Sequence, residues 1–358
     1  MSLQLTSLHN KHVNLGAKMA PFAGFDMPLQ YSSVKEEVIA VRSNCGVFDV
    51  SHMGEFLCVG EDAEKFVDFM VTNDFLGAGS NKAVYSPLCR ENGTVIDDLI
   101  AYKLSHGRVL ICVNASNIEK DWDWFNEFVG DFDCTLTNLS SEYSLLAIQG
   151  PKTEQILKDL EIIDSAEFPY YSVKESEFNG NELILARTGY TGEDGFEIFC
   201  SHKFAGELWD KLLSVGVAPC GLAARDVLRV EVCYPLYGHE ITDDITPLDA
   251  GLKWTVKLNK PEFIGKQALS EYQAKYTLVK LALEKGIPRE GYEVLNAADE
   301  IIGKVTSGTM SVTANKGVAI CQVEANKNPK DKNYKIRIRK NDFEATYYAK
   351  AFVTGGHK

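Results

Sequence analysis

Positive charge and long apolar runs are both scarce in this 358-residue chain. Lys and Arg number 37 against 50 Asp and Glu, which gives a formal net charge of −13. Because proteins that bind nucleic acid normally present a basic face, this balance argues against a nucleic-acid partner. No apolar stretch approaches the length of a membrane-spanning helix, and residues 1–20 lack the apolar core of a secretory signal. We therefore expect no membrane contact and a cytoplasmic location.

Paired cysteines are also missing. The nine cysteines are an odd number, none forms a Cys-x-x-Cys pair, and none stands at zinc-ligand spacing with a histidine. Most lie in apolar runs, as Cys112 does within residues 109–113. Small buried thiols in a reducing compartment account for this pattern, so we expect neither structural disulfides nor a metal.

Nucleotide-binding glycine motifs are absent as well, although one segment is rich in glycine. Residues 187–197 read Arg-Thr-Gly-Tyr-Thr-Gly-Glu-Asp-Gly-Phe-Glu, and three glycines within seven residues indicate positive φ angles or a close backbone approach. No Gly-Lys-Ser/Thr follows, and the spacing differs from that of the dinucleotide fingerprint. A β-hairpin turn and a ligand-binding loop explain the segment about equally well.

The chain is too long for one compact core, and its pattern changes near Thr277. Before that point hairpins and amphipathic helices are grouped rather than strictly alternating, which predicts an α+β region. Helices are expected over residues 34–44, 63–71, 118–129, 153–160, 204–215 and 221–232, and strands over 48–59, 84–88, 94–103, 108–113, 134–138, 143–149, 182–187 and 196–200. Residues 19–31, rich in Pro, Gly and aromatics, are expected to form an ordered loop. After Thr277, short alternating runs separated by turn residues predict an all-β barrel or roll.

Two adjacent carboxylates, Asp97 and Asp98, lie inside the strand expected over residues 94–103. Side chains alternate across a strand, so the two carboxylates face opposite ways, and burying an unpaired one is costly. Asp98 shares its face with Ile100 and Tyr102. It is either a base or electrostatic partner for a substrate amine, or a structural residue bonded to the hairpin backbone or to an arginine.

Two arginines, Arg225 and Arg229, stand four residues apart and therefore share one face of the helix expected over residues 221–232. Beside an apolar stripe they would clamp a carboxylate. A solvated salt-bridge face that includes Asp226 and Glu231 is the equally weighted alternative.

His52 follows Asp49 and Ser51 closely in the chain. The three residues are too near in sequence to form a hydrolase triad, and no Gly-x-Ser-x-Gly elbow exists. We expect a satisfied structural histidine at this position.

Eight segments, taken together and in order, resemble the folate-dependent aminomethyltransferase family over nearly the whole chain. They are Met-Ala-Pro-Phe-Ala-Gly-Phe-Asp-Met-Pro (19–28), Gly-Val-Phe-Asp-Val-Ser-His-Met (46–53), Gly-Thr-Val-Ile-Asp-Asp-Leu-Ile (93–100), Ile-Gln-Gly-Pro (148–151), Thr-Gly-Tyr-Thr-Gly-Glu-Asp-Gly-Phe-Glu (188–197), Pro-Cys-Gly-Leu-Ala-Ala-Arg-Asp (219–226), Leu-Tyr-Gly-His-Glu (236–240) and Val-Thr-Ser-Gly (305–308). Each segment alone is weak, but their shared order and spacing are specific.

The resemblance implies an α+β fold of three domains arranged as a cloverleaf around a central folate site. A folate-binding region would cover residues 1–275 as two intertwined subdomains, one near 47–140, and a β-barrel domain would cover 276–358. The implied reaction transfers the methylene carbon from the aminomethyl-dihydrolipoyl arm of the H-protein of glycine cleavage to tetrahydrofolate. Ammonia is released and 5,10-methylenetetrahydrofolate forms. The implied partners are thus the lipoylated H-protein and tetrahydrofolate.

The resemblance also gives individual residues roles. Asp98 matches the family's catalytic carboxylate, and Glu197 matches a carboxylate that accepts hydrogen bonds from the pterin amino group and ring nitrogen. Arg225 matches a folate-contacting arginine. The positions that match the lining of the folate cavity, or support it from one turn away, are Met53, Tyr85, Asn114, Tyr190 and Arg229. Family members can end in a tail with a tyrosine, which residues 351–358 lack.

Two other functions stay open at this point. One is a folate-dependent demethylase that acts on a small methylated compound, and the other is a folate-binding protein without transfer activity. The chain has no flavin-binding domain of the kind found in sarcosine dehydrogenases, and it lacks the Lys-Gly-Cys-Tyr-x-Gly-Gln segment of the non-catalytic relatives. Asp98, Glu197 and Arg225 together favour an enzyme.

Overall fold

The computed structural model describes residues 2–164 and 168–356. The chain divides into two compact units that interleave along the sequence. The first unit comprises Met1–Ser86, Leu99–Arg225 and Gly355–Lys358, and the second comprises Pro87–Asp98 and Asp226–Thr354. Within the described residues, no helix is long and apolar enough to cross a membrane.

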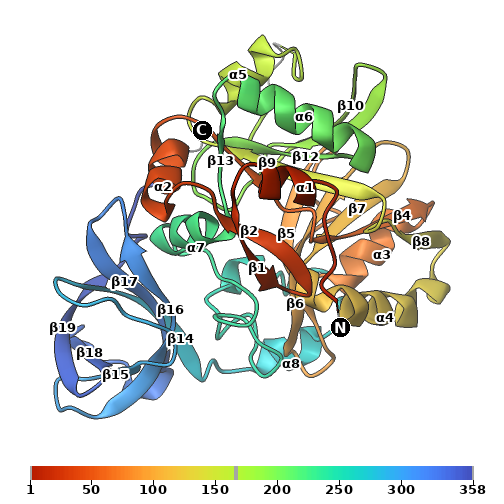
Figure 1. Ribbon diagram of the computed structural model, residues 1–358. Coiled ribbons are helices and arrows are strands. Elements are labelled where there is room, and N and C mark those ends of the chain that lie inside the picture. The colour runs from red at the N-terminus through yellow and green to blue at the C-terminus, as the bar shows by residue number, and fades with distance from the viewer. Residues whose placement is uncertain (1, 165–167, 357–358) are drawn as a thin grey trace. The chain divides into compact units, whose positions relative to one another are not determined.

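A six-stranded sheet lies in the first unit, in the order β10-β11-β12-β9-β3-β13 (Figure 1). Its strands are β3 (Gly46–Asp49), β9 (Tyr143–Gln149), β10 (Val173–Phe178), β11 (Asn181–Ala186), β12 (Gly195–Ser201) and β13 (Ala218–Pro219). Helix α6 (His202–Ser214) packs on it through the fully buried Trp209. Ser201 begins this helix by accepting a hydrogen bond from the Phe204 N–H at 3.4 Å.

A five-stranded sheet follows the order β5-β6-β7-β4-β8. Its strands are β4 (Gly54–Gly60), β5 (Ala83–Cys89), β6 (Val95–Lys103), β7 (Arg108–Val113) and β8 (Cys134–Asn138). Helices α3 (Ala63–Met70) and α4 (Ile118–Phe128) accompany it, with short 3₁₀ turns η1 (Ala115–Asn117) and η2 (Val129–Asp131). Phe56 of β4 meets the rings of Trp122 and Phe125 edge-on at 5.2 and 6.1 Å, so α4 covers the side of the sheet to which Phe56 points.

The N-terminal part of the first unit differs from expectation. Residues 19–31 were expected to form a loop, but they form a hairpin of β1 (Lys18–Phe22) and β2 (Phe25–Gln30), paired antiparallel. Its tight turn places Ala23 and Gly24 at positive φ. Three helices complete the unit, namely α1 (His9–Asn14), α2 (Val34–Ser43) and α5 (Thr153–Asp159).

The second unit contains a closed barrel in the order β14-β17-β16-β15-β18-β19, coloured blue in Figure 1. Its strands are β14 (Tyr276–Leu283), β15 (Glu293–Leu295), β16 (Ile301–Ser311), β17 (Lys316–Glu324), β18 (Tyr334–Ile338) and β19 (Asn341–Tyr348). Pairing of β14 with β19 closes the ring, so no edge strand is left. Helix α7 (Leu222–Glu231) begins in the first unit and ends in the second. The second unit also contains η3 (Lys253–Thr255), α8 (Lys266–Glu271) and η4 (Ala325–Lys327).

The predicted α+β region and C-terminal barrel are both confirmed, and most expected elements begin and end within a few residues of those observed. Two expectations were wrong. Residues 19–31 form a hairpin rather than a loop, and residues 48–59 are not one strand, because a turn at 50–53 separates β3 from β4. Strands β10 and β15 were not predicted. All nine cysteines are free in the structure.

Candidate functional site

Strand β6 separates the two adjacent carboxylates as strand geometry requires. Asp97 is completely buried, whereas Asp98, like Ile100 two residues later, is partly exposed. The alternation therefore leaves Asp98, and not Asp97, open to a substrate. The catalytic role of Asp98 stays a prediction.

Glu197, the carboxylate predicted to bind the pterin, is buried. It lies on β12, paired with Ala186 on one side and Ala147 on the other, and only 7% of its surface is exposed. The Thr188 hydroxyl donates to Glu197 Oε2 at 2.6 Å. Burial raises the pKa of Tyr102 well above its usual range, and the charge of Glu197 raises it further, so the phenol stays protonated beside the carboxylate.

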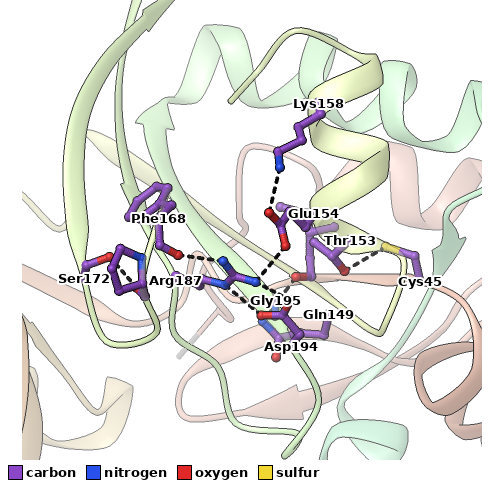
Figure 2. A network of polar contacts seen from close by, with 12 residues as sticks. Cys45, Gln149, Thr153, Glu154, Lys158, Phe168, Ser172, Arg187, Asp194 and Gly195 are labelled. Carbon is purple, nitrogen blue, oxygen red and sulfur yellow. Dashed lines mark hydrogen bonds and ion pairs between the residues drawn. The ribbon is translucent and has the colours of Figure 1, made fainter. Parts of the chain in front are cut away.

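The glycine-rich residues 188–195 form a loop that Arg187 clamps at its base (Figure 2). Arg187 donates to both oxygens of Asp194, at 2.9 and 2.6 Å, and also to Glu154 Oε2 at 2.9 Å and the Phe168 carbonyl at 2.6 Å. A bidentate pair of this kind fixes both distance and orientation. The residue before the loop and the residue near its end are thereby locked together.

Gln149, at the end of β9, holds the same loop from a second side. Its amide nitrogen donates to the Thr188 carbonyl at 3.1 Å, and its amide oxygen accepts from the Thr191 hydroxyl at 2.8 Å. A Cβ on Gly189 or Gly195 would lie within 2.4 Å of the Gln149 side chain, which explains the glycines at those positions. The sequence pattern indicated the close approach but not the partner.

Helix α7 positions Arg225, and its start is fixed by two contacts. The Gly221 N–H donates to the buried Glu37 Oε2 at 2.8 Å, and a Cβ on Gly221 would lie 2.3 Å from the backbone of Leu29. Four residues later the Arg225 guanidinium lies over the Tyr190 ring, 4.7 Å from its centroid. The structure therefore brings together two of the predicted folate-binding residues.

Arg225 also carries an open donor. Its Nη1 is buried and has no hydrogen-bond partner in the part of the chain that the structure describes. A buried guanidinium nitrogen without a partner is costly unless a ligand or water accepts its hydrogen bond. An anionic or carbonyl oxygen would meet this requirement, so the arrangement favours the clamp interpretation for Arg225.

Arg229 has a different environment. It is 1% exposed and donates to Glu240 Oε2 at 2.9 Å, to Ser307 Oγ at 2.7 Å and to Asp226 Oδ1 at 2.9 Å. These contacts belong to the second unit. The ion pair with Asp226 agrees with the salt-bridge interpretation, but the arginine is buried rather than solvated. A supporting role toward folate stays a prediction.

The remaining predicted lining residues are half-buried side chains in the first unit. Met53 lies in the turn before β4, Tyr85 on β5 and Asn114 directly after β7. Asn73 donates to the Tyr85 carbonyl at 2.9 Å and so holds that strand position. Partial exposure is compatible with a ligand contact at each of the three residues.

The motif at 49–53 contains an arrangement that the sequence did not reveal. Asp49 accepts from His12 Nε2 at 2.8 Å and from the Thr6 hydroxyl at 2.7 Å, with both His12 and Asp49 fully buried. The histidine partner of Asp49 is therefore distant in sequence. His52 is buried, but the expectation that it is satisfied was wrong, because its Nδ1 has no partner among the described residues.

The C-terminal tail reaches the glycine-rich loop although the tail lacks a tyrosine. The Gly356 N–H donates to the Gly192 carbonyl at 2.9 Å. A Cβ at Gly356 would lie 2.3 Å from Glu193 Oε2, so glycine permits this approach. The tail thus touches the loop that carries Tyr190; residues 357 and 358 lie outside the described part.

Comparison with known proteins gives the family. Residues 8–260 match the model of the GCVT N-terminal domain, and residues 277–353 match that of the glycine cleavage T-protein C-terminal barrel domain. The chain belongs to the glycine cleavage T-protein family of aminomethyltransferases. The resemblance to the folate-dependent aminomethyltransferase family is thereby confirmed.

Individual relatives agree over most of their length. Aminomethyltransferases from Thermosipho melanesiensis and Thermotoga maritima are each 46% identical to it, with 90% of both chains covered. The crystal structure of glycine cleavage system aminomethyltransferase T from Bartonella henselae matches with a TM-score of 0.93 at 31% identity, covering 99% of each chain. These matches leave the demethylase and the non-catalytic alternatives without support.

Proposed function

We propose that this member of the family binds tetrahydrofolate through Glu197, Arg225 and Tyr190, and uses Asp98 as its catalytic carboxylate. The observation that carries the proposal is a buried donor, unsatisfied among the described residues, in the same unit as a buried carboxylate. Arg225 Nη1 is a buried donor with no partner in the described structure, and Glu197 is a buried acceptor in the same unit. A reduced pterin with an attached aminobenzoyl-glutamate offers both donors and acceptors.

The proposed reaction takes the aminomethyl group from the dihydrolipoyl arm of an H-protein. The methylene carbon gives up its bonds to sulfur and to nitrogen and forms two bonds to folate nitrogens. Two N–H protons of the folate end on the thiol and on the departing ammonia. Asp98, a partly exposed carboxylate, would accept a hydrogen bond from a substrate amine and stabilise positive charge that develops there.

Further properties follow from the same proposal. We expect Met53, Tyr85 and Asn114 to line the folate site, and we expect the domain boundary near residue 276. The free cysteines support a reducing compartment, which is the cytoplasm for a bacterial-type enzyme. The lipoylated H-protein is the expected macromolecular partner.

The test measures formation of methylenetetrahydrofolate and ammonia from aminomethyl-loaded H-protein, with wild type beside Asp98→Asn. The substitution keeps the size of the side chain but removes the charge and replaces one acceptor oxygen with an NH2 donor. We expect wild type to turn over and kcat of the variant to fall by about two to four orders of magnitude. Asp97→Asn, at the buried neighbour on the other face of β6, is the control. A wild type that binds tetrahydrofolate but produces neither product would refute the proposal.

A further inference from the structure

His52 lies in the turn between β3 and β4, and one of its ring nitrogens lacks a hydrogen-bond partner among the described residues. The residue is 3% exposed, and its Nδ1 is buried with no hydrogen-bond partner in the described structure. Native proteins satisfy nearly all such atoms, so an exception calls for an explanation. The next residue in the chain, Met53, is a predicted folate-lining position.

The neighbours of His52 hold its ring in place but do not satisfy it. The rings of Phe22 and Phe25, from the β1–β2 hairpin, meet the imidazole at centroid distances of 5.3 and 6.4 Å, and the Phe22 contact is edge-on. Both phenyl rings lack a hydrogen-bonding group. Their contacts orient the imidazole by packing alone.

Asp49 is near His52 but is committed elsewhere. Its Oδ2 accepts from His12 and Thr6, and its Oδ1 accepts from the Ser51 N–H at 3.0 Å. The aspartate therefore forms a pair with His12 rather than with His52. His52 is not the imidazole of a buried Asp–His couple.

The charge state of His52 is fixed by its surroundings. Burial lowers the pKa of His52 to about 4, the charge of Asp49 opposes this shift, and the positive charge of Arg225 adds to it. The imidazole is therefore neutral near neutral pH, with one nitrogen as donor and the other as acceptor. A neutral ring can donate a hydrogen bond without adding a charge beside the arginine.

Arg225, like His52, carries a buried polar atom, Nη1, that lacks a hydrogen-bond partner in the described residues. Helix α7, which carries Arg225, begins directly after Gly221, and Gly221 lies against Leu29 of the β1–β2 hairpin. The Phe22 and Phe25 rings that pack on His52 belong to the same hairpin. Both side chains belong to the first unit. Two unsatisfied polar atoms on residues held by the same hairpin indicate a shared missing partner.

We propose that His52 is a ligand-binding residue whose Nδ1, together with Arg225 Nη1, binds one oxygen of the folate substrate. With the proton on Nδ1, both atoms donate, so the partner is a carbonyl or carboxylate oxygen. This inference rests on the proposed function, because it takes tetrahydrofolate as the ligand. It adds a residue to the site and explains both unsatisfied atoms with one group.

His52→Phe is the decisive variant. Phenylalanine keeps a ring between Phe22 and Phe25 but removes both nitrogens. We expect the Kd for tetrahydrofolate, measured by calorimetry with the full-length protein, to rise about tenfold. We expect the thermal midpoint without ligand to stay level or to rise, because the variant buries no unsatisfied nitrogen. A histidine with a purely structural role would show the opposite pattern.

Three further measurements complete the test. His52→Gln restores a neutral donor and should recover part of the affinity. His202→Phe, at an exposed histidine with partners of its own, should leave Kd unchanged. In a double-mutant cycle with Arg225→Gln, the two effects should be less than additive, because both donors serve one oxygen.

The outcomes separate this inference from the proposed function. If wild type binds no tetrahydrofolate, the proposed function itself fails. If wild type binds but His52→Phe binds equally well, His52 is not a ligand-binding residue. Affinity and thermal midpoint lost together in His52→Phe, without rescue by His52→Gln, would also overturn the inference, since they would show a packing role.

Discussion

The guanidinium carbon of Arg225 lies 4.7 Å from the centroid of the Tyr190 ring. This contact joins the first turns of α7 to the glycine-rich loop after β11, two segments that are far apart in the chain. A cation over an aromatic face is attracted by the ring quadrupole, and the planar guanidinium is held in one orientation. The contact therefore aims the open Nη1 of Arg225 while leaving it free of protein partners in the described structure.

The ring of Tyr190, more than its hydroxyl, is expected to position Arg225. We predict that Tyr190→Leu raises the KM for tetrahydrofolate about five- to tenfold, as loss of a partly desolvated cation–π contact of about 1 kcal/mol implies. Tyr190→Phe keeps the ring face and should change KM by less than about threefold. Steady-state kinetics with aminomethyl-loaded H-protein measure both values. Equal effects of the two substitutions would show that the hydroxyl matters instead.

Local sequence patterns were sufficient for most of the fold. Helix α2 begins where it was expected, because the Ser33 hydroxyl accepts a hydrogen bond from the Glu36 N–H and donates one to the Glu36 carboxylate. The β1–β2 hairpin was missed because Pro21 and Pro28 interrupt its strand signal. Strand β15 has three residues, too few for any alternation to be recognised.

The site was predictable only in part. Strand alternation put Asp97 and Asp98 on opposite faces, and helix periodicity placed Arg225 and Arg229 on one helix face. The choice of Asp98 came from the family resemblance. Neither pattern shows which side chains from distant segments meet. The Asp49–His12 pair joins residues 37 positions apart, and periodicity within a strand or helix carries no information about such a contact. The roles of Glu197 and Tyr190 came from family resemblance alone.

Asp49 should make stability depend on acidity. Burial alone would raise the pKa of Asp49, but hydrogen bonds from His12 and Ser51 and the charge of His12 outweigh it and hold the pKa below the ordinary value of 3.8. Because the folded-state pKa is depressed, the stabilisation is fully present above the unfolded-state pKa. It is lost as pH falls through the folded-state pKa.

Asp49→Asn tests this dependence. We predict a loss of about 3–5 kcal/mol in the free energy of unfolding near neutral pH, because the variant removes a buried carboxylate that accepts hydrogen bonds from His12, Thr6 and the Ser51 N–H. The difference from wild type should shrink as pH falls below about 4, the pKa of an aspartate in the unfolded chain, and disappear below the depressed folded-state pKa, where wild-type Asp49 is neutral as well. Urea unfolding at several pH values measures it. Asp26→Asn, in the partly exposed His9–Asp26 pair, should cost less than about 1 kcal/mol.

Arg187 is expected to matter for stability and for folate affinity together. Arg187→Lys cannot reproduce the bidentate contact with Asp194, and both of these side chains are less than 10% exposed. We predict a loss of about 3 kcal/mol in unfolding free energy and a weaker Kd for tetrahydrofolate, since the loop with Tyr190 loosens. Arg108→Lys, in a pair with Glu175 whose side chains are about a third exposed, is the matched control. If both variants lost the same unfolding free energy and the same affinity, the buried Arg187–Asp194 pair would contribute no more than a partly exposed ion pair.

The C-terminal tail should tune folate affinity through the loop that it touches. Gly356→Ala places a Cβ against Glu193, and that carboxylate is not free to move because Arg42 donates to its other oxygen at 2.9 Å. The tail must then lift and lose the hydrogen bond to the Gly192 carbonyl. One hydrogen bond contributes about 1 kcal/mol, so we predict that KM for tetrahydrofolate rises about fivefold. Deletion of residues 355–358 should give the same increase, whereas Gly79→Ala, with open space around its Cβ, should give none. If the deletion left KM unchanged while Gly356→Ala raised it, strain on Glu193 and not loss of the tail contact would be the cause.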